Sequence, residues 1–160
     1  EDCLSLMATQ QPMARDLRLI IAVLLIGTEL ERMGDHAEGI AKITLMLADE
    51  PLLKPLVDIP RMADKAREML RRSLDAFIAR DAEAAKKIAA EDDEVDALYD
   101  RVYQELLTFM ISDPRNITRA THLLWVAHNL ERIADRATNI CERVVFTVTG
   151  RMEEINVSKY

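Results

Sequence analysis

Two stretches of this chain carry the same pattern of acidic residues, offset by one hundred positions. Residues 30–41 and residues 130–141 share the pattern L-E-R-x-x-D-x-A-x-x-I. Residues four apart lie on one face of a helix. We expect that face to point into a helical bundle, where carboxylates are costly to bury unless a cation neutralises them. The two acid pairs, which predict two related metal sites, are Glu31 with Asp35 and Glu131 with Asp135.

A third pair of acids, Asp92 and Asp96, has the same spacing in another segment. Asp92 falls at a core position of the apolar series there, and Asp96 lies one turn further along, at its edge. Neighbouring helices of a bundle lie about 8–10 Å apart, so this pair and the pair at 131 and 135 can converge on one cation. Oxygen ligands suit magnesium, manganese, calcium or ferric iron rather than structural zinc. Asn139 could add an amide oxygen.

The same acids have a simpler interpretation, as solvated carboxylates paired with Arg32 and Arg132. Ion pairs between helix residues four apart are common on protein surfaces and contribute little. The duplication and the core position of Asp92 favour the metal site, but the sequence leaves both interpretations open. Spacing alone does not decide between them.

None of the three histidines, His36, His122 and His128, follows a Glu by three residues. The Glu-x-x-His pattern of di-iron bundle enzymes is therefore absent. A His-Glu-x-x-His motif, a Gly-rich phosphate loop and a nucleophile elbow are also absent from the sequence. We expect the histidines to be structural; His128, one turn before Glu131, is the one most able to act as a ligand. A metal-dependent oxidase or phosphohydrolase stays as the alternative to a protein that binds metal without catalysis.

The composition indicates an all-α protein. The 160 residues are 49% hydrophobic and 31% charged, with four Gly and 4% aromatic residues, which is typical of a folded helical domain. The net charge of -7 argues against a general nucleic-acid binder, which needs a basic surface. Cys3 and Cys141 form no C-x-x-C pair and indicate a reducing cytosol. The apolar run at residues 19–28 is too short to span a bilayer.

Apolar periodicity predicts four long helices and a Pro-containing linker. The expected segments are a stub at 1–10, helices at 12–48, 58–80, 82–112 and 114–149, a linker at 49–60 and a polar tail at 151–160. Asp81 and Asp113 are expected to cap helices, and Gly150 to end the last one. Residues 58–150 then form a complete three-helix bundle, whereas residues 1–48 supply only one long helix of a matching repeat. If the repeat is real, we expect the chain to be a fragment that lacks the helices of its first repeat.

These residues resemble the PhoU family, the accessory regulators of bacterial phosphate uptake. The strings that carry the resemblance are Gln11-Pro12-Met13-Ala14-Arg15-Asp16-Leu17-Arg18, Glu29-Leu30-Glu31-Arg32-Met33-Gly34-Asp35, Glu91-Asp92-Asp93-Glu94-Val95-Asp96, and Leu130-Glu131-Arg132-Ile133-Ala134-Asp135-Arg136-Ala137-Thr138-Asn139-Ile140-Cys141-Glu142. They span nearly the whole chain. The doubled motif together with the P-x-A-x-D-L-R string is specific.

The resemblance implies two tandem three-helix bundles, the second complete and the first reduced here to its last helix. It implies that the acid pairs bind metal ions, often iron or zinc; with the oxygen ligands considered above, the candidate ions are iron, zinc, manganese and magnesium. It also implies an adaptor without enzymatic activity, which represses the phosphate-starvation response and links a phosphate ABC transporter ATPase to a membrane sensor histidine kinase. The protein would be cytoplasmic and peripheral to the inner membrane through these partners. The exposed apolar face of the 12–48 helix is expected to drive homo-oligomerisation.

Overall fold

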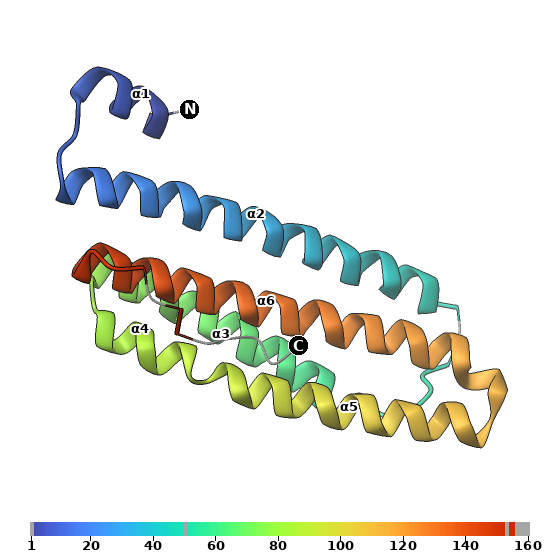
Figure 1. Ribbon diagram of the computed structural model, residues 1–160. Helices are drawn as coiled ribbons and strands as arrows, with labels where there is room; N and C mark the ends of the chain where they lie inside the picture. The colour runs from blue at the N-terminus through green and yellow to red at the C-terminus, as the bar shows by residue number, and fades with distance from the viewer. Residues whose placement is uncertain (1, 50, 153, 156–160) are drawn as a thin grey trace.

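The computed structural model describes residues 2–49, 51–152 and 154–155, and the secondary structure in these ranges is entirely helical (Figure 1). The elements are α1 (Asp2–Gln10), α2 (Arg15–Leu47), α3 (Asp58–Ala79), α4 (Ala82–Ala89), α5 (Asp92–Ser112), the short 3-10 helix η1 (Pro114–Asn116) and α6 (Ile117–Thr149). The all-α prediction is confirmed. Every helix in the described ranges is too short or too polar to cross a membrane.

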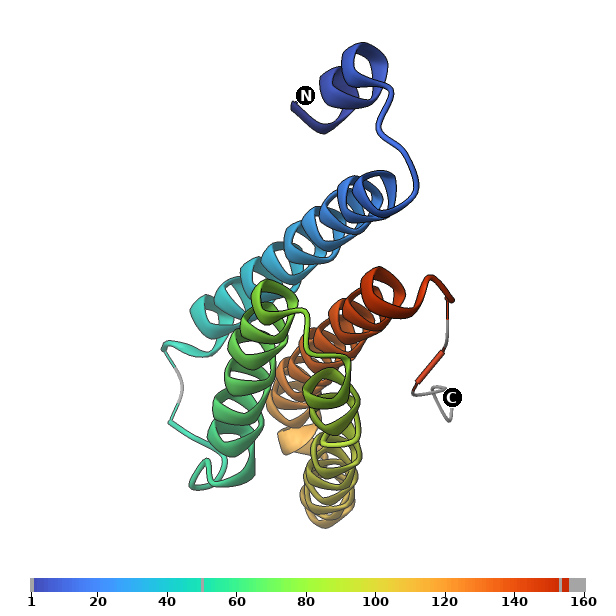
Figure 2. The ribbon, with the colours of Figure 1, turned by 90° about the vertical axis from the view of Figure 1, so that its left-hand side faces the viewer.

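Helix α6 is the centre of the bundle. Helix α2 packs along one side of it, and α3, α4 and α5 pack along it from the other direction (Figures 1 and 2). This position explains the residue pattern of α6, in which buried residues occur on most of its circumference. The fully buried side chains of the core include Met62, Met69, Val95, Val102, Leu106, Ile140 and Val144. Burial of these apolar side chains is the main stabilising contribution to such a bundle.

Helix α3 shows how the sequence specifies this packing. Its buried positions recur every three or four residues, which places them on one stripe of the helix. The stripe consists of Ile59, Met62, Ala66, Met69, Ser73 and Ala76. It faces α6, with which α3 makes extensive contact.

The contacts between α2 and α6 repeat with the offset of one hundred positions. Arg136 Nη1 donates a hydrogen bond to Glu29 Oε2 at 3.3 Å, and His36 Nδ1 hydrogen-bonds to Asn129 Oδ1 at 2.9 Å. Position 129 corresponds to position 29, and position 136 to position 36. Moving each residue of the Glu29–Arg136 contact by one hundred positions, onto the other helix, therefore gives the positions of the His36–Asn129 contact. This is the relation expected for equivalent helices of two repeats.

The predicted helix at 82–112 is wrong as a single element, because it is divided between α4 and α5. At the division, Glu91 N–H bonds to Ile88 O at 3.0 Å and Glu94 N–H to Glu91 O at 3.1 Å, both three residues back. The Glu91 side chain contacts Lys65 Nζ at 2.8 Å and Arg72 Nη1 at 2.7 Å on α3. The tight turn lets Glu91 reach both cations, and periodicity alone gives no sign of it.

The start of the 12–48 helix is also wrong, because α2 begins at Arg15. Ala14 has φ 45 and ψ -100, outside helical geometry, so Pro12 precedes the helix instead of lying in its first turn. The predicted 114–149 helix begins with η1, and α6 proper starts at Ile117. Its end is as expected: Gly150 has a φ of 77, a left-handed conformation that glycine adopts without a steric penalty.

The two irregular segments are anchored to the bundle. In the 49–60 linker, Lys54 is buried and forms an ion pair with Glu105 of α5. In the predicted tail, Ile155 N–H donates a hydrogen bond to Glu142 Oε1 of α6 at 3.1 Å. The remaining predictions for the ends of the chain concern Glu1, residue 153 and residues 156–160, which lie outside the described residues.

Candidate functional site

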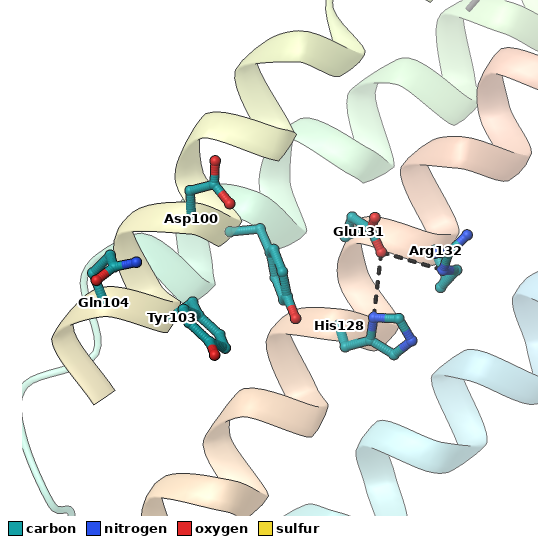
Figure 3. Close-up of a pocket in the computed structure, with 7 residues that line it drawn as sticks. Asp100, Tyr103, Gln104, His128, Glu131 and Arg132 are labelled. Carbon is teal, nitrogen blue, oxygen red and sulfur yellow. Dashed lines mark ion pairs between the residues drawn. The ribbon is translucent and has the colours of Figure 1, made fainter. Parts of the chain in front are cut away.

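The acid pair of α6 lies beside α5. Glu131 is 7% exposed and Asp135 is half-buried. The Arg132 guanidinium contacts both acids, with Nε at 3.3 Å from Glu131 Oε2 and Nη1 at 2.8 Å from Asp135 Oδ2. His128 Nδ1 lies 3.4 Å from Glu131 Oε2 (Figure 3). Glu131 Oε2 is nevertheless buried and accepts no well-aligned hydrogen bond within the described part of the chain.

Burial dominates the electrostatics of this pair. Burial, together with the charges of Asp135 and Asp96, raises the pKa of Glu131 to about 7, and the charge of Arg132 opposes this rise. Burial also raises the pKa of Asp135, with Arg132 and then Arg136 acting in the opposite direction. Burial lowers the pKa of His128, and the charge of Arg132 adds to that effect. A cation close to these carboxylates would favour their ionised forms.

The acid pair of α5 is arranged as the sequence predicted. Asp92 is 3% exposed, at the first residue of α5, and Asp96 is half-buried one turn later. Acidic residues in the first turn of a helix are stabilised by its dipole, which helps to compensate the burial of Asp92. Asp96 is close enough to Glu131 to affect its pKa. The pairs of α5 and α6 are thus electrostatically coupled.

These acids fit a hard cation in chemical type but are not assembled around one. They supply carboxylate oxygens, and the Oε2 atom of Glu131 is buried without a hydrogen bond in the described residues. No group of three or more His, Cys, Asp or Glu side chains in those residues has the geometry of a metal site. The guanidinium of Arg132 lies between Glu131 and Asp135 and occupies the position that a metal ion bound to both acids would need. Metal binding here requires Arg132 to move aside.

The other acid pair, Glu31 and Asp35, is exposed on α2, so the expectation that it faces the bundle interior is wrong. The residues of α2 that pack on α6 include Glu29, Met33 and His36, and position 31 lies on the opposite side of the helix from position 29. Within the described chain, no helix covers Glu31 or Asp35 on that side.

Asn139 also differs from the expectation. Its Nδ2 donates to Glu29 Oε2 at 3.3 Å, so its amide is directed toward α2 rather than toward the acids of α5. The other two histidines contact neighbouring side chains: His36 bonds to Asn129, and the His122 ring packs against Trp125 at a centroid distance of 5.6 Å.

A pocket of about 360 Å³ opens between α5 and α6 next to the buried acid Glu131. From α5 it is lined by Tyr99, Asp100, Tyr103 and Gln104, and from α6 by His128, Glu131 and Arg132. Figure 3 shows the labelled side chains of the two helices on opposite sides of it. The sequence prediction missed the four α5 residues. The signal that could have found them is a pair of tyrosines four residues apart, next to Asp100, on the helix that also carries Asp92 and Asp96.

Cys141 is poorly suited to act as a nucleophile. The thiol is fully buried, and burial raises its pKa to about 12. The thiolate, which is the reactive form, is therefore negligible at neutral pH.

Comparisons with known proteins agree on one family. Residues 1–44 and 59–144 match the family model described as "PhoU domain". The chain is 41% identical over 152 residues to the phosphate-specific transport system accessory protein PhoU homolog of Deinococcus radiodurans, covering 95% of the chain and 71% of the relative. It is 47% identical over 130 residues to the homolog of the same name from Aquifex aeolicus, covering 81% of the chain and 59% of the relative.

A solved structure gives the same result. The crystal structure of the phosphate transport system regulatory protein PhoU from Streptococcus pneumoniae superposes with a TM-score of 0.87 at 34% sequence identity. The match covers 95% of this chain and 71% of that one. The chain thus spans between 59% and 71% of the length of these three proteins.

Proposed function

The chain belongs to the PhoU domain family, and from this premise we propose that it is a metal-binding, non-enzymatic negative regulator of phosphate uptake. The names of its relatives, accessory and regulatory proteins of a phosphate transport system, support a role in phosphate transport. The observation that carries the metal-binding part is the coupling of Glu131 to the acids Asp135 and Asp96 at a buried position. A divalent or ferric cation would relieve their repulsion and the cost of their burial.

The proposed metal ligands are Asp92 and Asp96 on α5 and Glu131 and Asp135 on α6. Iron, zinc, manganese and magnesium are the candidate ions; the carboxylate donors favour the harder ions among them. The bound metal would replace the Arg132 guanidinium between the two α6 acids and fix α5 against α6.

The adaptor role rests on exposed surface. Helix α2 exposes large apolar side chains beside the acids Glu31 and Asp35, among them Leu17, Leu24 and Leu30. An exposed apolar surface with a polar rim is typical of a protein interaction site. We place contacts with a phosphate ABC transporter ATPase, a sensor histidine kinase or a second copy of the chain on this face. It would act in the cytoplasm at the inner membrane, and Glu31 and Asp35 would bind metal only when such a contact covers them.

The metal proposal is tested by elemental mass spectrometry of the purified chain after incubation with iron, manganese, zinc or magnesium. Retained metal is expected in the parent and in a Glu31→Gln/Asp35→Asn control, and loss of metal in a Glu131→Gln/Asp135→Asn variant. The two double variants remove the same charges from equivalent positions of α2 and α6. Absence of metal from the parent, or equal retention in both variants, would contradict the assignment of the α5–α6 acids as ligands.

The regulatory proposal is tested separately, in a bacterium that lacks its own PhoU protein. Expression of this chain is expected to lower a phosphate-starvation reporter in phosphate-rich medium. A reporter that stays fully active despite stable expression of the chain would contradict the proposal.

A further inference from the structure

We infer that the pocket between α5 and α6 is a binding site for an organic cation, namely a protonated alkyl amine. The site shares Glu131 with the proposed metal ligands, but its α5 wall, formed by Tyr99, Asp100, Tyr103 and Gln104, contains none of those ligands. Its volume of about 360 Å³ is near the lower end of the range for small-molecule sites, roughly 300–1,000 Å³. An alkyl ammonium chain fits in such a space.

The charges around the pocket select a cation over an anion. Glu131 and Asp100 line it, and the charges of Asp135 and Asp96 also act on Glu131. Arg132 is the one permanently charged cation among the lining residues, and it is already in contact with Glu131 and Asp135. Inorganic phosphate would therefore meet two lining carboxylates and an excess of negative charge, which disfavours anion binding.

Glu131 supplies the charged contact within the pocket. Its side chain is 10% exposed, and its Oε2 atom is buried and accepts no well-aligned hydrogen bond in the described residues. A buried carboxylate oxygen without a hydrogen bond is costly. An ammonium group carries three donors and no acceptor, so it can supply this bond. Asp100, which is exposed, can accept a second hydrogen bond from the same ammonium group.

The two tyrosines suit the remainder of such a ligand. Tyr99 and Tyr103 lie one turn apart on α5, and the Tyr99 ring is tilted against His128 at a centroid distance of 6.2 Å. Tyr103 is 40% exposed, so its ring is accessible to a ligand. Tyrosine faces attract cations, by about 0.5–1 kcal/mol at exposed sites and about 2 kcal/mol when water is excluded. The methylene groups of an alkyl amine can pack on the same rings.

Binding is tested by isothermal titration calorimetry on the chelator-treated and dialysed chain, without added metal. The probes are putrescine, as a free amine, and Nα-acetyl-lysine N-methylamide, as the side chain of a partner protein. The controls are the same lysine derivative acetylated at Nε and inorganic phosphate. Saturable one-to-one binding is expected for at least one of the two amines and for neither control. Tighter binding of putrescine would identify a free small molecule as the natural ligand, and tighter binding of the lysine derivative would identify a lysine side chain of a protein.

Variants at Tyr103 and Asp100 separate this site from the metal site. We expect Tyr103→Leu to weaken amine binding about two- to five-fold and Tyr103→Phe to leave it unchanged. Asp100→Asn is expected to weaken it several-fold, and Glu38→Gln, which removes an exposed acid from α2, to leave it unchanged. Circular dichroism checks that each variant is folded. Metal content should be equal in the parent and in Tyr103→Leu.

The inference is overturned if neither amine gives saturable binding to the folded chain. It is also overturned if Glu38→Gln weakens binding as much as Asp100→Asn, because binding would then follow only the net charge. Equal binding of the Nε-acetylated derivative would likewise exclude recognition of an ammonium group. A failure of the metal proposal would appear in metal content and not in these titrations.

Discussion

Replacing Glu131 by glutamine is expected to stabilise the metal-free protein at alkaline pH and to leave it unchanged at acidic pH. Glutamine keeps the size and shape of the side chain and removes its charge. The pKa of Glu131 is raised from its ordinary value of 4.5 to about 7, mainly by burial. The folded protein therefore holds the proton over a pH range in which the unfolded chain has already released it. The free energy of unfolding then falls as the pH rises from about 4.5 to about 7.

The size of the effect follows from the two pKa values. One pH unit corresponds to about 1.4 kcal/mol, so the difference between 4.5 and about 7 gives an upper limit of about 3 kcal/mol. The coupling of Glu131 to Asp135 and Asp96 shares this cost among three acids. We expect Glu131→Gln to be more stable than the parent by about 1–3 kcal/mol at about pH 8, and by less than about 0.5 kcal/mol at about pH 4.

The assay is urea unfolding followed by circular dichroism, at both pH values and in the presence of a chelator. Glu31→Gln is the matched control, because Glu31 is the equivalent residue of α2 and is exposed; its stability should match that of the parent at both pH values. A Glu131→Gln variant that is less stable than the parent at about pH 8 would refute the reasoning. So would a gain in stability of equal size at both pH values, since such a gain would not come from ionisation.

Three further predictions concern single residues. Asp81→Ala should cost about 1 kcal/mol in urea unfolding, because Asp81 accepts the Ala84 N–H hydrogen bond at 2.9 Å as the cap of α4; an unchanged midpoint would contradict this. Gly34→Ala should stabilise the protein by about 0.5–1 kcal/mol, since a Cβ at Gly34 meets nothing within 4 Å; destabilisation would show that the space is not open. Cys141 should react with a thiol reagent only after denaturation, whereas the half-buried Cys3 should react in the native state, and Cys3→Ser should abolish that native reaction.

Local sequence signals predicted the helices well where a single local factor, such as burial of one face or the backbone geometry of a helix end, determines the structure. The apolar stripe from Ile59 to Ser73 defines α3, because only one face of that helix can be buried. Asp81 and Gly150 mark a start and an end through backbone geometry that few residues satisfy. The division of the 82–112 segment was missed because its cause is the pairing of Glu91 with Lys65 and Arg72 on another helix.

The candidate site was predictable only in part, for the same reason. Asp92 was identified as buried because it interrupts an apolar series, and the structure confirms it at 3% exposure. The walls of the pocket were missed, because Tyr99 and Tyr103 have the spacing of ordinary core residues. Their function as walls depends on the gap left between α5 and α6. No pattern within either helix specifies that gap.

The sequence by itself determined that Glu31 and Asp35, like Glu131 and Asp135, share one face of a helix, because that relation depends only on the geometry of 3.6 residues per turn. Only the tertiary structure decided that the pair on α6 is buried and the pair on α2 is exposed. The physical reason is that desolvation depends on what covers a side chain. Helix α5 lies over Glu131, whereas no helix in the described chain lies over Glu31. The same local motif therefore gives a strongly raised pKa at Glu131 and a solvated surface at Glu31.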